Sequence, residues 1–154
     1  MPTLVRADGS ALFDSPVIVE YLDSLKPPPL IPAAGEPRWQ VLRWAALADG
    51  ILDQAVGRTM ELRRPAAERL AEANQRREQK IARALAFAER AVPAGSYLAE
   101  GRLTLADIAF AVALEYIDLR YPHDWRSRHG RLAAWHAGVA ARPAFVATRP
   151  PASA

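Results

Sequence analysis

The stretch Leu103–Arg120, LTLADIAFAVALEYIDLR, decides the fold that we predict for this chain. It is typical of a helix that is apolar on almost every side, and a helix without a polar face belongs inside a hydrophobic core. It is also too short to span a membrane. Thr104 and Asp107 have the spacing of a capping box, in which side chains satisfy backbone N–H groups at the start of a helix. We therefore assign both residues to folding and expect other helices to pack around this one.

The composition is that of one globular domain, or of one domain and part of another. The 154 residues are 51% hydrophobic and 24% charged, and they include no cysteine. Without cysteine these residues form no disulfide framework and supply no cysteine nucleophile, which fits a reducing, cytoplasmic compartment. The three histidines lack metal-ligand spacing, so no metal is expected. The net charge of +3 comes from scattered basic residues, which favours neither a nucleic-acid nor a membrane partner.

The chain divides into two parts at a proline-rich segment. Residues 1–26 predict a hairpin turning at Asp8-Gly9, followed by a helix with Ser15 as its N-cap. Residues 27–36 predict a linker, and residues 37–154 predict an all-helical domain. The helices expected in that domain cover 38–61, 65–92, 104–120 and 132–141. A lone hairpin with one helix is marginally stable, so the first part has the character of the end of a larger sheet domain.

This combination resembles the soluble glutathione S-transferases, most closely the bacterial ones. In that family a thioredoxin-like domain is followed by a linker and an all-helical domain. Four short motifs carry the resemblance besides the helix after Pro16: a cis-proline-like segment at 1–4, a hairpin with an acidic-Ser pair at 8–15, the capping box at 104–107, and Arg-Pro-x-Phe at 142–145. The implied fold class is mainly α: an incomplete thioredoxin-like piece, a β-hairpin plus helix, followed by the all-helical C-terminal-type bundle.

The resemblance implies a glutathione site at the start of the first helix. Asp14 would hold the α-amino group of the tripeptide, and the Ser15 hydroxyl with nearby backbone N–H groups would hold a carboxylate. Pro2, if cis, would present the backbone of Met1 to the cysteinyl part. Spacing alone favours a purely structural role for Asp14 and Ser15 as helix-starting residues, and the family order favours the binding role.

A hydrophobic electrophile would lie against the helical domain. Trp44, Leu47, Ala48 and Ile51 fall on one helix that should face the cleft, so we expect some of them to line the electrophile pocket. For each residue taken singly, plain core packing is the competing interpretation.

The family's catalytic Tyr, Ser or Cys lies in an earlier segment that has no counterpart in this sequence, so no catalytic residue is assigned. The resemblance implies glutathione as co-substrate, no bound cofactor, a homodimer and a cytoplasmic location. The expected function is glutathione conjugation or reduction of hydrophobic electrophiles, with the activity of such a truncated chain left open. The alternative is a non-catalytic dimerisation or protein-interaction module of the same fold.

Overall fold

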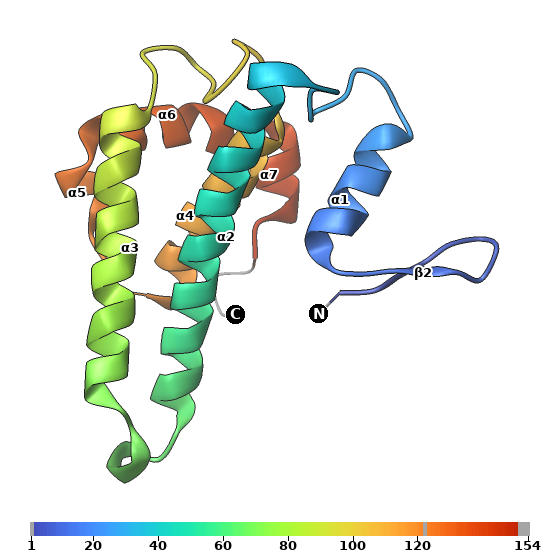
Figure 1. Ribbon diagram of the computed structural model, residues 1–154. Helices are drawn as coiled ribbons and strands as arrows, with labels where there is room; N and C mark the ends of the chain where they lie inside the picture. Colours follow the sequence, from blue (N-terminus) through green and yellow to red (C-terminus); the bar gives the residue numbers. More distant parts are fainter. Residues whose placement is uncertain (1, 122, 151–154) are drawn as a thin grey trace.

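The computed structural model describes residues 2–121 and 123–150, and its ribbon shows a small hairpin with one helix beside a larger helical part (Figure 1). The elements are β1 (Leu4–Val5), β2 (Ala11–Leu12), α1 (Ser15–Ser24), α2 (Gly35–Arg63), a 3-10 turn (Ala66–Glu68), α3 (Ala71–Ala91), α4 (Leu105–Arg120), α5 (Trp125–Arg128), α6 (Gly130–Ala140) and α7 (Pro143–Thr148). This order confirms the mainly α fold class.

The hairpin forms where the sequence predicts it. β1 and β2 are antiparallel, with Leu4 opposite Leu12 and Val5 opposite Ala11. Gly9 adopts a φ of +82° in the connecting turn, a conformation that glycine reaches without a steric penalty. The hairpin therefore follows from local turn chemistry.

The N-cap of α1 is Asp14, one residue before the predicted Ser15. The Asp14 backbone is extended and its carboxylate accepts a hydrogen bond from the Ser15 N–H, which makes Ser15 the first helical residue. Pro16 consequently takes the second helical position. Asp and Ser are about equally good caps, so the sequence alone did not separate them.

The core lies between α2, α3, α4 and α6. In Figure 1, α2 and α3 run side by side in front, with α4 behind them and α6 across one end. Phe110 of α4 is completely buried, and its ring centroid lies 5.1 Å from that of Trp44 and 5.9 Å from that of Trp135. One aromatic residue of α4 thus joins α2 to α6.

The capping box at the start of α4 is present and fully buried. One Asp107 carboxylate oxygen accepts from the Thr104 backbone N–H at 2.9 Å and from the Thr104 hydroxyl at 3.0 Å. The other accepts from the Leu98 backbone N–H at 2.8 Å. Asp107 therefore fixes both the first turn of α4 and the segment that leads into it.

One face of α4 remains open, although we expected helices on all sides. Val112 is 47% exposed, and Ile108, Tyr116 and Leu119 are partly exposed. α2 and α6 pack on the other sides of α4, so an apolar strip faces outward. No helix of residues 2–121 and 123–150 is long and apolar enough to cross a membrane.

Other element boundaries also differ from the sequence prediction, and two short helices were not predicted. α3 begins at Ala71, because the chain after Pro65 first forms a 3-10 turn and the buried Glu61 carboxylate accepts from the Leu70 backbone N–H at 2.7 Å. α5 and α7 are short helices in stretches that showed too few residues for a periodic pattern.

Candidate functional site

The start of α1 presents a carboxylate and a hydroxyl to the exterior. Asp14 and Ser15 are both exposed, and the Ser15 hydroxyl makes no hydrogen bond to the part of the chain that the structure describes. Asp14 sits at the helix N-terminus, where free backbone N–H groups favour an anion. Met1 lies outside the described residues, and so does the Met1–Pro2 peptide bond. Pro2 itself is exposed.

The negative charge of Asp14 affects the pKa of Asp49, a carboxyl group in the middle of α2. Burial raises the pKa of the Asp49 carboxyl, and the neighbouring charges of Asp53 and then Asp14 raise it further. The charge of Asp14 thus acts on the Asp49 carboxyl, and negative charge at this place favours a cation. The sequence shows Asp49 and Asp53 four residues apart on one helical face, but it gives no sign that the charge of Asp14 acts on Asp49.

The structure places most of the expected electrophile residues inside the core. Trp44, Ala48 and Ile51 are between 0% and 3% exposed and pack in the main hydrophobic cluster, and only Leu47 is partly buried at its edge. None of the four lines the apolar hollow that lies along the open face of α4. Their shared helical face is turned toward α3 and α4, so core packing describes three of them.

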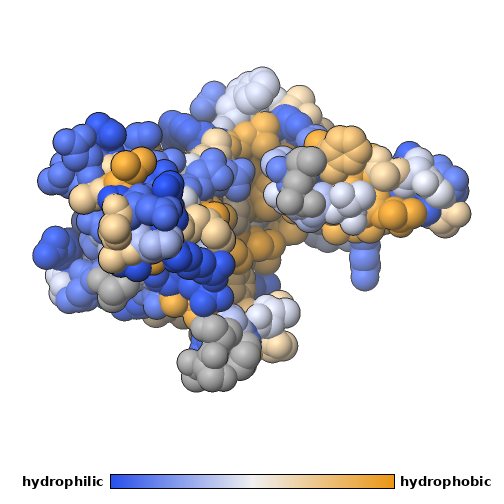
Figure 2. Space-filling view, turned by 90° about the horizontal axis from the view of Figure 1, so that it is seen from below, coloured by the Kyte–Doolittle hydropathy of each residue, from blue (hydrophilic) through white to orange (hydrophobic). Residues whose placement is uncertain are grey.

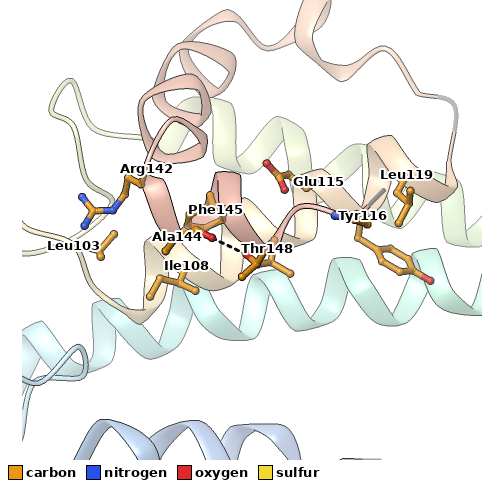
Figure 3. Close-up of a pocket in the computed structure, with 11 residues that line it drawn as sticks. Leu103, Ile108, Glu115, Tyr116, Leu119, Arg142, Ala144, Phe145 and Thr148 are labelled. Atoms are coloured by element: carbon orange, nitrogen blue, oxygen red, sulfur yellow. Dashed lines mark hydrogen bonds between the residues drawn. The ribbon is translucent and has the colours of Figure 1, made fainter. Parts of the chain in front are cut away.

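An apolar hollow of about 370 Å³ lies along the open face of α4, next to α7 (Figure 3). Ile108, Val112, Tyr116 and Leu119 form its α4 side, and Phe145 closes it from α7. Seen from below, hydrophobic residues gather in the space between the helical part and the N-terminal part (Figure 2). This hollow has room for a hydrophobic molecule. The core residues of α2 are packed against other side chains and leave no such room.

A charged group borders the hollow. Glu115 lies 3.5 Å from the Arg149 guanidinium and 3.9 Å from the Nε2 atom of the buried His136. Burial, reinforced by the positive charge of Arg126, lowers the pKa of His136 to about 4. His136 is therefore neutral at pH 7. The residues that the structure describes contain no cluster of three or more side chains able to hold a metal ion.

Comparison with known proteins settles the family. A GST-like protein of Escherichia coli K12, YibF, described as uncharacterized, is 32% identical over 158 residues, which cover 98% of this chain and 75% of that protein. The chain belongs to the glutathione S-transferase family. Residues 71–138 match the family model of the glutathione S-transferase C-terminal domain.

Solved structures of glutathione S-transferases share this fold over nearly the whole chain. One from Methylobacillus flagellatus, with glutathione bound, has a TM-score of 0.94 and 37% identity, and the match covers 98% of this chain and 76% of the other. A family member from Pseudomonas fluorescens Pf-5, with S-(propanoic acid)-glutathione bound, has a TM-score of 0.91 and 40% identity over 98% and 77%. The resemblance to a bacterial-type transferase is thereby confirmed.

Proposed function

We propose that this chain binds glutathione at the start of α1. The observation that carries the proposal is the pairing of Asp14 with Ser15 at an exposed helix N-terminus, from which the charge of Asp14 also raises the pKa of the Asp49 carboxyl. The α-ammonium group of glutathione would meet the Asp14 carboxylate, and a glutathione carboxylate would meet the Ser15 hydroxyl and the helix N–H groups. Relatives between 37% and 40% identical have glutathione or a glutathione thioether bound.

The reaction that we propose is attack of the glutathione thiolate on a small hydrophobic electrophile, which is either conjugated as a thioether or reduced while two glutathione molecules are oxidised to their disulfide. The apolar hollow of Figure 3 supplies a surface for such a molecule, since its α4 side consists, apart from Glu115, of uncharged aliphatic and aromatic side chains. The group that would activate the thiol is not assigned among the described residues. We infer neither a bound cofactor nor a metal in this reaction, and we propose a cytoplasmic homodimer.

The binding proposal is tested with Asp14→Asn. Asparagine caps a helix about as well as aspartate, so the change removes the charge and leaves α1 capped. We expect glutathione to bind about tenfold more weakly by calorimetry, since one ion pair with the ammonium is lost. Glu72→Gln, an equivalent change at an exposed position of α3, should leave the affinity unchanged.

A second ligand sharpens this test. Glutathione acetylated at its α-amino group carries no ammonium, so Asp14→Asn should not weaken its binding. If the variant binds glutathione as tightly as the parent does, or loses both ligands equally, Asp14 does not recognise the ammonium and the assignment is wrong.

The non-catalytic alternative is favoured by one observation, the outward apolar strip on α4. Apolar patches of this kind also mark surfaces where proteins associate. An interaction module predicts self-association in sedimentation experiments and no glutathione binding. Saturable glutathione binding combined with thioether formation from an aryl halide would contradict it.

A further inference from the structure

A second hollow, of about 660 Å³, lies far from the start of α1. It is formed by the loop between α3 and α4 and by one face of α6. In Figure 1 this loop and α6 occupy the upper end of the helical part, whereas the hairpin lies at the lower right. The hollow is therefore separate from the proposed glutathione site, and Arg142 is the one described lining residue that it shares with the apolar hollow along α4.

The side chains that line this second hollow carry hydrogen-bond donors and positive charge. Arg131 and Arg142 are the charged residues among them, and Ser96 and Tyr97 add hydroxyl groups. No carboxylate lines the hollow among the residues that the structure describes. Positions 131, 135 and 138 are three or four residues apart, so they lie along one face of α6, and Arg142 follows its C-terminal end.

Trp135 gives an independent sign of a ligand. It lines the hollow, is only 5% exposed, and its indole Nε1 finds no hydrogen-bond partner within residues 2–121 and 123–150. A buried indole N–H normally has an acceptor, because losing water without gaining a partner is unfavourable. The Nε1 atom is closed to solvent in this structure, so an acceptor that enters from the hollow satisfies this donor once the indole side chain shifts toward it.

The arginines remain available to such an acceptor. Arg142 is half-buried, and no described carboxylate lies within 4.0 Å of its guanidinium, which points away from Glu115 in Figure 3. Arg131 is held by a hydrogen bond from its guanidinium to the Val92 carbonyl. The neighbouring Glu89 is already engaged, since its carboxylate accepts from the backbone N–H groups of Arg131 at 3.1 Å and Leu132 at 2.9 Å.

We propose that this hollow binds a small organic oxyanion, a carboxylate or a phosphate, through the Trp135 indole N–H and the guanidinium groups of Arg131 and Arg142. Arginine suits the planar or tetrahedral oxygen arrangement of these groups, and hydrogen bonds to an ionised acceptor are stronger than neutral ones. Pro93, Ala94 and Val139 give the hollow an apolar side, which fits an anion with a hydrocarbon body.

The test follows the indole N–H of Trp135 by ¹⁵N–¹H NMR while benzoate and inorganic phosphate are added separately to the full chain. Trp135→Phe identifies the signal by removing it. We expect a saturable shift of that signal, and Arg142→Gln should weaken the binding at least tenfold. Saturation by benzoate alone identifies a carboxylate with an apolar body, and saturation by phosphate alone identifies a phosphate ligand.

Two further variants keep the test decisive. Gly138 lines the hollow, and a Cβ atom there would meet no atom within 4 Å, so Gly138→Leu should fill the hollow, abolish binding and preserve the melting temperature. Arg83→Gln, an exposed arginine of α3, should change nothing. Asp14→Asn should also leave this binding intact, which separates it from the glutathione proposal. The proposal is overturned if neither probe saturates the signal. It is also overturned if binding is undiminished in both Arg142→Gln and Gly138→Leu.

Discussion

His136 makes the stability of this protein depend on pH. It is 4% exposed, packs edge-on against Trp125, and is surrounded by Glu115, Asp118, Arg126 and Arg149. Burial, with Arg126 as the next cause, lowers its pKa in the folded protein to about 4 from an ordinary value of 6.5. The unfolded chain therefore binds a proton more readily between these two values, and protonation favours unfolding.

We expect this contribution to stability to be complete above pH 6.5 and to be lost as the pH falls toward 4. The loss should amount to about 3 kcal/mol in all, because each unit of pKa difference corresponds to about 1.4 kcal/mol. Urea unfolding at several pH values measures it. Since carboxyl groups also titrate there, the informative quantity is the difference from His136→Gln, whose stability should fall less steeply; equal slopes would show that His136 does not cause the dependence.

At the scale of single residues, sequence reasoning found the groups whose roles are local. Thr104 and Asp107 stand three positions apart, and that spacing suffices to predict their mutual hydrogen bonds. For Trp44 spacing left core packing and a pocket role both open, and it gave no expectation for Asp49 on the same helix. Whether a helical position faces a neighbouring helix, the hollow or Asp14 depends on tertiary packing, and no local pattern records it.

At the scale of the element, the start of α4 depends on Asp107. Its carboxylate accepts from three donors, the backbone N–H groups of Leu98 and Thr104 and the Thr104 hydroxyl, and it is completely buried. Asp107→Ala leaves these donors without a partner, so we expect a loss of about 3 kcal/mol in the free energy of unfolding. Asp53→Ala makes the same substitution at an exposed position of α2 and should stay within about 0.5 kcal/mol.

Two substitutions of Thr104 distinguish the contribution of its hydroxyl group to stability from that of its methyl group. Thr104→Val keeps the buried shape and removes the hydroxyl, whereas Thr104→Ala removes both. We expect Thr104→Ala to cost about 1 kcal/mol for the lost cap and somewhat more for the vacated methyl volume, as chemical denaturation would measure. If Thr104→Val is as stable as the parent, the hydroxyl contributes nothing and the capping role is wrong.

Element by element, the long periodic helices α2, α3 and α4 were predictable, and their ends were less so. Hydrophobic periodicity is a property of many residues together, whereas an end is decided by one or two hydrogen bonds. α3 begins later than predicted, and the Glu61 carboxylate accepts a hydrogen bond from the Leu70 backbone N–H just before it. These two residues are nine positions apart, so the contact cannot be read from spacing. The open face of α4 was missed for a related reason, because an apolar surface predicts burial without saying what covers it.

At the scale of the whole molecule, polar contacts join the N-terminal part to the helical part, and α1 adds little to the core. α1 has no fully buried residue among its ten. The Arg38 guanidinium lies 2.7 Å from Glu20, and the Asp23 carboxylate accepts from the backbone N–H groups of Leu30 at 2.6 Å and Ile31 at 2.9 Å. The core of α2, α3, α4 and α6 contains no side chain from residues 2–26.

This distribution predicts that the two parts open independently. Local stability follows buried apolar contact, so backbone amides of α1 should exchange with deuterium at least about 100-fold faster than those of α4. A chain beginning at residue 27 should keep its helical circular dichroism and melt within about 3 °C of the full chain, because no core contact is removed. It should also lose glutathione binding together with Asp14 and Ser15. Equal exchange rates in α1 and α4, or collapse of the shortened chain, would instead mean that the hairpin and α1 are part of one cooperative unit, and the predicted boundary at 27–36 would then mark only a loop within it.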